Sequence, residues 1–142
     1  MIKPDAFLLV TGDEFSPSKA EALLNLDFGS TKNEPGDLGV KGKYKDRPKP
    51  YGSATINYSW LDCSAGLEMG IPDLLPPNLD LFLIPNFIGT LRNCGGTDIT
   101  LYINVGYDSQ CNMELSPQLL TKLAELNITI GITCYQLEEH DL

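Results

Sequence analysis

The sequence predicts a single α+β domain in which helices pack on one face of an antiparallel or mixed β-sheet. Three observations predict it: stretches where apolar and polar residues alternate, two amphipathic stretches that begin with Ser-Pro, and the placement of both between strand-like segments. A ferredoxin-like arrangement with two related halves is the leading form of this prediction, and a curved mixed sheet is the second. The length fits one domain, 1–142, that can bury a core.

Residues 6–11 are predicted to form a buried strand, and a helix follows it. Ser16 can cap this helix by accepting a free backbone N–H, and Pro17 suits the first helical position, where no N–H is needed. The helix is expected to end near Asp27, with Gly29 available as a stop. Its inner face is expected to carry three apolar residues: Ala20, Leu23 and Leu24.

Residues 30–52 form a long polar, basic stretch that is rich in proline and glycine. A loop of this length is uncommon in a compact domain unless it is functional or mobile. A half-buried strand is expected over 54–61, because Ile56, Tyr58 and Trp60 alternate with polar residues.

Prolines interrupt an apolar segment within residues 66–96. Pro85 could open a short helix that runs through Arg92 and is closed by the glycine pair at 95–96. A longer helix beginning near Asn78 would have to kink at that proline.

The last third is predicted to contain a hairpin, a helix and a closing strand. Alternation over 99–105, a turn at 106–109 and alternation over 111–115 indicate the hairpin. A helix follows from Ser116, and the final strand covers 128–134. The inner face of this helix is expected to carry four residues: Leu119, Leu120, Leu123 and Ala124.

The formal charge of −9 is unevenly distributed. Between Lys32 and Lys49 lie six basic and three acidic residues, so this segment carries +3 and the rest of the chain −12. An acidic body repels phosphates, which argues against nucleic acid as a partner, and it attracts a basic partner. Acidity that only maintains solubility is an equally valid interpretation. No secretory signal or membrane span is recognisable, which predicts a cytoplasmic protein without a membrane partner.

The sequence is poor in catalytic groups. Its one histidine, His140, lies in the tail 138–142, which is expected to be acidic and solvated. We therefore expect no enzyme activity, no cofactor and no metal site. An enzyme that uses carboxylates such as Asp13, Asp37 and Asp62 is the weakest of the functional hypotheses. The cysteines lie far apart and are expected to be buried free thiols rather than disulfides: Cys63, Cys94, Cys111 and Cys134.

The basic stretch “KGKYKDRPKPYG” is the best functional candidate among the residues. Its lysines and tyrosines could hold an anionic ligand or an acidic strip of another protein. The favoured interpretation is a solvated flexible loop whose lysines prevent edge pairing, because no residue there requires a partner. The candidate partner-binding residues lie here and near the last strands: Lys41, Lys43, Tyr44, Lys45, Arg47, Tyr107, Asp108, Glu138 and Glu139.

Four segments give the chain its overall pattern: “TGDEFSPSKAEALLNL”, “PGD”, “YSWLDCSAG” and “ELSPQLLTKLAELNITIGITCY”. Their order resembles the bacterial family designated domain of unknown function 4279, over nearly the whole chain. One departure is the proline-rich segment 72–85, where the family prefers a more regular helix. The family has no established catalytic residues, so the resemblance transfers none.

The resemblance implies an immunity protein, because small acidic bacterial proteins of this type resemble those encoded beside polymorphic toxins. Such a protein binds a toxin domain and covers its active site, and an acidic body suits a basic toxin such as a nuclease. We therefore expect a non-catalytic protein that binds a cognate toxin. The alternative is a small-ligand-binding or regulatory module in which residues 32–51 gate a pocket beside Trp60.

Overall fold

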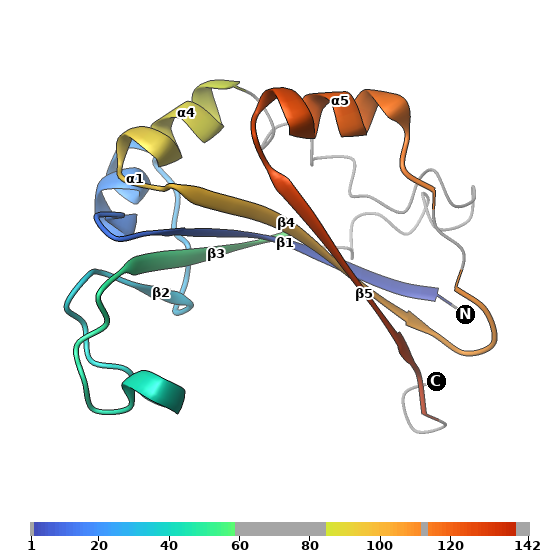
Figure 1. The fold of residues 1–142 in the computed structure, drawn as a ribbon, viewed down its shortest axis with the longest axis horizontal. Helices are drawn as coiled ribbons and strands as arrows, with labels where there is room; N and C mark the ends of the chain where they lie inside the picture. The colour runs from blue at the N-terminus through green and yellow to red at the C-terminus, as the bar shows by residue number, and fades with distance from the viewer. Residues whose placement is uncertain (1, 59–84, 112–113, 139–142) are drawn as a thin grey trace. The chain divides into compact units, whose positions relative to one another are not determined.

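The structure, a computed structural model, describes residues 2–58, 85–111 and 114–138. Five strands form one mixed sheet in the order β2-β3-β1-β4-β5 (Figure 1). The strands are β1 (Ile2–Gly12), β2 (Lys32–Asn33), β3 (Gly52–Tyr58), β4 (Asp98–Tyr107) and β5 (Thr129–Gln136). The helices are α1 (Pro17–Leu24), α4 (Pro85–Asn93) and α5 (Pro117–Glu125), with a 3-10 turn η1 (Gly42–Tyr44). The predicted α+β class is confirmed.

The sheet is mixed because its two ends pair differently. β2 runs antiparallel to β3, whereas β5 runs parallel to β4. The second form of the fold prediction, a mixed sheet, is therefore the one observed, and the ferredoxin-like arrangement stays a prediction.

The chain folds into two compact units. The first-half unit comprises Leu8–Ile56 and Ile84–Ile99, with α1, β2, β3 and α4. The second-half unit comprises Met1–Phe7, Asn57–Leu83 and Thr100–Leu142, with α5 and β5. Strands β1, β3 and β4 contribute residues to both units, since the last two residues of β3 belong to the second-half unit. The expectation of one domain over 1–142 stays a prediction.

In the first-half unit, the predicted helix start is confirmed. The hydroxyl of Ser16 accepts the N–H of Lys19 at 3.4 Å, and Pro17 occupies the first turn. The helix ends at Leu24 rather than near Asp27, because Asn25 adopts the left-handed conformation with φ 53° and closes it.

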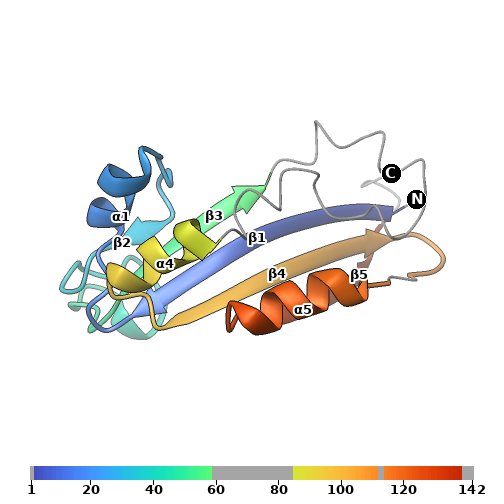
Figure 2. The ribbon, with the colours of Figure 1, turned by 90° about the horizontal axis from the view of Figure 1, so that it is seen from above.

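The predicted inner face of α1 is wrong at one position, since Leu23 is 70% exposed while Ala20 is fully buried. Phe15, which precedes the helix, is fully buried and contributes to the core instead. Helices α1 and α4 pack against each other (Figure 2). A helix beginning at Pro85 is confirmed, and the N–H of Gly96 closes it by donating to the carbonyl of Leu91.

Part of residues 30–52 is regular structure rather than loop. It contains β2 and η1, and two further bridges join Leu38 to Pro48 and Gly39 to Lys45. The next strand, predicted over 54–61, is confirmed as β3, with Ala54 and Ile56 buried. Trp60 and the segment 66–84 lie outside the described residues.

In the second-half unit, β4 and β5 form a parallel pair joined through α5, and α5 packs on β5 (Figure 2). The alternation in β4 is confirmed, with Leu101, Ile103 and Val105 fully buried. The predicted hairpin is wrong as far as the described residues show, because residues 108–111 and 114–116 form no strand. The physical reason is that β4 already has β1 on one side and β5 on the other, so no edge is open to a returning strand.

Helix α5 begins as predicted, with the Ser116 hydroxyl accepting the N–H of Leu119 at 3.1 Å. Of its expected inner face, Leu123 is buried, whereas Leu120 is 44% exposed and Ala124 is exposed. Leu123 is the one buried residue of α5, so the helix contacts the rest of the fold along a narrow stripe. Across the described ranges, no helix has the length and apolar character needed to cross a membrane.

Candidate functional site

The candidate residues fall into two separate groups. The basic residues lie in what we call the basic lobe, residues 32–51 of the first-half unit. Tyr107, Asp108 and Glu138 lie in the second-half unit, where β4 and β5 end. Glu139 lies outside the described residues.

Backbone hydrogen bonds close the basic lobe on itself. The N–H of Gly36 donates to the carbonyl of Lys49 at 2.7 Å, and the N–H of Lys49 donates to Asp37 at 2.8 Å. Further along, the N–H of Gly39 donates to the carbonyl of Arg47 at 2.9 Å. The lobe is therefore a small folded substructure, built as two facing segments around η1.

The tip of the basic lobe combines cationic and apolar side chains. Val40 is 86% exposed and Leu38 is 64% exposed. The ammonium of Lys43 lies 5.3 Å from the ring centroid of Tyr44, which meets the ring of Tyr51 edge-on at 6.0 Å. The lysines and arginine around these residues are exposed at the surface: Lys41, Lys43, Lys45 and Arg47.

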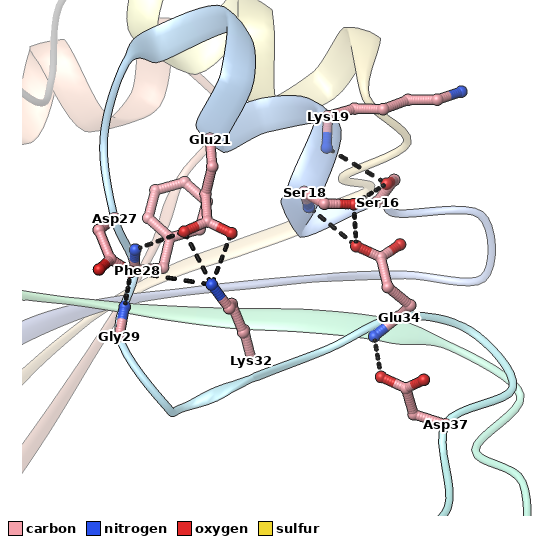
Figure 3. Close-up of polar contacts among 10 residues, drawn as sticks. All are labelled: Ser16, Ser18, Lys19, Glu21, Asp27, Phe28, Gly29, Lys32, Glu34 and Asp37. Atoms are coloured by element: carbon pink, nitrogen blue, oxygen red, sulfur yellow. Dashed lines mark hydrogen bonds and ion pairs between the residues drawn. The ribbon is translucent and has the colours of Figure 1, made fainter.

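A carboxylate of the lobe joins it to α1 (Figure 3). One oxygen of Glu34 accepts both the N–H of Ser18 at 2.8 Å and its hydroxyl at 2.6 Å, while the N–H of Glu34 donates to Asp37. Desolvation opposes ionisation, but the hydrogen bonds from Ser18 outweigh it and hold the pKa of Glu34 below its ordinary value. The Glu34 carboxylate is therefore engaged in hydrogen bonds that support the fold. The same is true of Asp37, one of the carboxylates considered for catalysis.

A second ionic contact in the same view uses the first lysine of the lobe (Figure 3). The ammonium of Lys32 lies 2.7 Å and 2.9 Å from the two carboxylate oxygens of Glu21, and 3.8 Å from Asp27. The hydrogen bond to Glu21 raises the pKa of Lys32. The N–H of Gly29, followed by the charge of Lys32, lowers the pKa of Asp27. Lys32 is thus paired inside the unit.

Where β4 and β5 end, a tyrosine ring of one strand lies over a glycine of the other. Gly106 pairs with Tyr135 in register, and a Cβ on Gly106 would come within 3.0 Å of the tyrosine ring and 2.8 Å of Leu137. The N–H of Leu137 donates to the carbonyl of Tyr107 at 2.6 Å. Aromatic side chains that cover a glycine in this way fix the register of a strand pair.

We define the strand-end surface as Tyr107, Asp108, Tyr135 and Glu138. Because Tyr135 lies on the face of its register partner Gly106, the next residue, Tyr107, lies on the opposite face. Tyr135 is 46% exposed, and Glu138 is exposed as well. The register therefore places three of the predicted residues, together with Tyr135, at the same end of the β4–β5 pair. The two tyrosines lie on opposite faces of that pair, and an acid follows each strand.

Tyr135 was absent from the sequence-based candidates because the final strand was expected to stop at residue 134. Gly106, the glycine that its ring covers, is distant in the sequence. Only the strand register therefore shows that the two residues are neighbours. A tyrosine one residue beyond the apolar alternation of the final strand is the signal that the sequence offers.

Two cysteine thiols meet in the second-half unit. The sulfur of Cys111 lies 3.2 Å from that of Cys134. Cys134 is exposed and Cys111 is partly exposed, so the expectation of buried thiols is wrong for both, because β5 presents Cys134 to solvent. The expectation is confirmed for Cys94, and Cys63 lies outside the described residues. The hydrogen bond to Cys134, followed by burial, raises the pKa of the Cys111 thiol.

An open pocket of about 290 Å³ lies in the first-half unit, at the junction of β1, β3 and β4. Its lining includes Asp13 from the turn after β1, Asp98 from the start of β4 and Tyr51 from the end of the basic lobe. In the ranges that the structure describes, no three histidine, cysteine, aspartate or glutamate side chains gather as a metal site would require. Asp62 lies outside these ranges.

Comparison with protein-family models, with curated proteins and with solved structures finds no match to this chain.

Proposed function

We propose that this protein is a non-catalytic binding protein whose partner is a basic protein. The observation that carries the proposal is the strand-end surface, where a tyrosine on each face accompanies Asp108 and Glu138. Tyrosine is enriched among the residues that contribute most to protein interfaces, because its rigid ring buries a large area at low entropic cost. Acids beside such rings select a partner of opposite charge.

The charge of the whole chain supports the same class of partner. Outside residues 32–49 the chain carries −12, which would attract a basic protein and accelerate the encounter at low salt. In its particular form, the proposal is a cytoplasmic immunity protein that neutralises a cognate bacterial toxin by covering its active site. The sequence resemblance supports this form, and occlusion requires no catalytic group on the protein that blocks.

Co-expression with the toxin encoded beside the gene tests the proposal. We expect the natural chain to restore growth and to co-purify with the toxin, and the variant Tyr135→Ala/Asp108→Lys to do neither. The matched control is Tyr44→Ala/Lys45→Glu in the basic lobe, which should still protect. Persistent toxicity with the natural chain, together with no recoverable complex, would reject the immunity function.

A second candidate function is a small-ligand-binding or regulatory module in which residues 32–51 gate a pocket. The open pocket favours it, since Tyr51 at the end of the basic lobe lines the hollow together with Asp13 and Asp98. A thermal-shift screen of small cationic compounds separates the two functions. Stabilisation that disappears in Asp98→Asn but persists in Asp108→Asn would favour the pocket over the strand-end surface.

A further inference from the structure

Two thiols of the second-half unit are close enough to react with each other. The sulfurs of Cys111 and Cys134 are 3.2 Å apart, although the residues are separated by 23 positions in the sequence. Bonded sulfurs lie roughly 2 Å apart, so a modest side-chain rotation is enough to join them. Cys111 is free to supply that rotation, because it lies in the irregular connection between β4 and α5.

Access to solvent distinguishes this pair from the buried thiol of Cys94. Cys134 is exposed and Cys111 is partly exposed, whereas Cys94 is 7% exposed. The thiolate is the reactive form of cysteine, and the hydrogen bond to Cys134 keeps the proton on Cys111 by raising its pKa. Cys134 is therefore the sulfur that meets an oxidant first, with Cys111 beside it to complete the exchange.

We propose that Cys111 and Cys134 form a reversible intramolecular disulfide by exchange with a low-molecular-weight disulfide of the glutathione class. The thiolate of Cys134 attacks one sulfur of the small disulfide, whose S–S bond breaks and releases one small thiolate. The thiolate of Cys111 then attacks the Cys134 sulfur of the mixed disulfide and releases the second. Two protein thiols are oxidised, the small disulfide is reduced to two thiols, and the two protein protons pass to the released thiolates.

The bond would tie the β4–α5 connection to β5 and would enclose the whole of α5 in a covalent loop. Cys134 pairs in register with Val105, so it lies on the same face of β5 as Gln136, the partner of Tyr107. Oxidation therefore acts next to the strand-end surface. Any effect on a protein partner rests on the proposed function, whereas formation of the bond does not.

Thiol mapping after equilibration with mixtures of reduced and oxidised glutathione tests the proposal. In a full-length Cys63→Ser/Cys94→Ala variant, we expect a species lighter by two hydrogens, with peptides linked through Cys111 and Cys134. Reductant should restore both thiols. Adding Cys111→Ser should instead leave a stable glutathione adduct on Cys134, because the second sulfur is missing.

The proposal is overturned if both thiols stay alkylatable under conditions that fully oxidise a reference glutaredoxin dithiol. It is also overturned if the adduct on Cys134 persists while Cys111 is present. Should the double variant fail to fold, mapping of the natural chain decides, since peptides linked to Cys63 or Cys94 contradict the assignment. Toxin affinity of the oxidised and reduced forms is measured separately, so a failed partner proposal leaves the disulfide result unaffected.

Discussion

The basic lobe is one short segment and the strand-end surface combines two, and different interactions stabilise them. In the lobe, facing backbone segments pair, and Lys32 and Glu34 make ionic and hydrogen-bonding contacts with α1. At the strand ends, a parallel register holds the backbone and Tyr135 covers Gly106. Part of the lobe's charge is therefore used inside the fold, whereas the strand ends place aromatic rings at the surface.

This difference separates ionic contacts that support the structure from aromatic rings that can contact a partner. A positively charged segment is a conspicuous candidate site in a sequence. In the basic lobe, however, several charged side chains already have partners in the first-half unit. At the strand ends the ring of Tyr135 is 46% exposed, and an exposed tyrosine ring contributes more to a protein interface than surface charge does.

The largest expected difference is between two glycines, one adjoining each region. A Cβ on Gly52, where the lobe leads into β3, would overlap the carbonyl oxygen of Phe15, which cannot move without the backbone. We expect Gly52→Ala to lower the free energy of unfolding by about 3 kcal/mol. A Cβ on Gly106 meets side chains of Leu137 and Tyr135, which can rotate, so Gly106→Ala should lower it by about 1 kcal/mol. Urea unfolding measures both, and the reverse order would contradict this view of the lobe's junction.

The next effect concerns partner affinity rather than stability. We expect Tyr135→Ala to weaken binding of the cognate toxin by about 2 kcal/mol, or roughly 30-fold, because an exposed ring in an acidic surface has the properties of an interface hot spot. Tyr44→Ala in the basic lobe is the matched control and should change affinity by less than about 0.5 kcal/mol. Isothermal titration calorimetry gives both values, and equal losses would remove the distinction between the two regions.

A smaller effect should appear in the contact between the lobe and α1. Ser18→Ala removes a hydroxyl that donates to Glu34, and we expect a loss of about 1 kcal/mol in unfolding free energy at pH 7. Since the folded pKa of Glu34 is lowered from 4.5, its stabilisation is present above that pH and is lost as pH falls through the folded value. The variant should therefore lose less stability on acidification than the natural chain does.

The control for this experiment is the serine that caps the other helix. Ser116→Ala removes a serine hydroxyl that caps a helix through a backbone N–H rather than a carboxylate, so it should cost about 1 kcal/mol without changing the dependence of stability on pH. Parallel pH profiles for the natural chain and the Ser18 variant would show that Glu34 gains nothing from Ser18.

The smallest effect is expected at the tip of the lobe. Lys43→Ala removes an exposed cation from the ring of Tyr44, and we expect it to lower the free energy of unfolding by about 0.5 kcal/mol. Thermal unfolding beside Lys41→Ala as a control measures the difference. A loss several times larger would mean that side-chain contacts, rather than the paired backbone, maintain the lobe.

Local signals in the sequence predicted the starts of the helices, because a serine cap and a proline in the first turn act within a few residues. Burial was predicted less well: Leu23 faces solvent, and Phe15, which precedes α1, fills the core instead. The expected hairpin was wrong because the neighbours of β4 are fixed by the order of the whole sheet. No local pattern contains that order.

The candidate site shows the same division between features that local sequence predicts and features that depend on the order of the sheet. Charge and turn composition predicted the basic lobe and the acids after β4 and β5. Tyr135 and the meeting of Cys111 with Cys134 could not be predicted, since both follow from the parallel register of β4 and β5. A hairpin, as the sequence indicated, would have paired these residues differently.

The affinity of two charge-reversed variants for the proposed toxin partner tests most directly whether a basic protein binds at the strand ends. One is Asp108→Lys/Glu138→Lys at the strand-end surface, and the other is Lys43→Glu/Lys45→Glu in the basic lobe. We predict that the first weakens the complex by roughly 100-fold or more, whereas the second changes affinity by less than roughly threefold. Loss of binding in the lobe variant, with full affinity in the strand-end variant, would contradict this assignment.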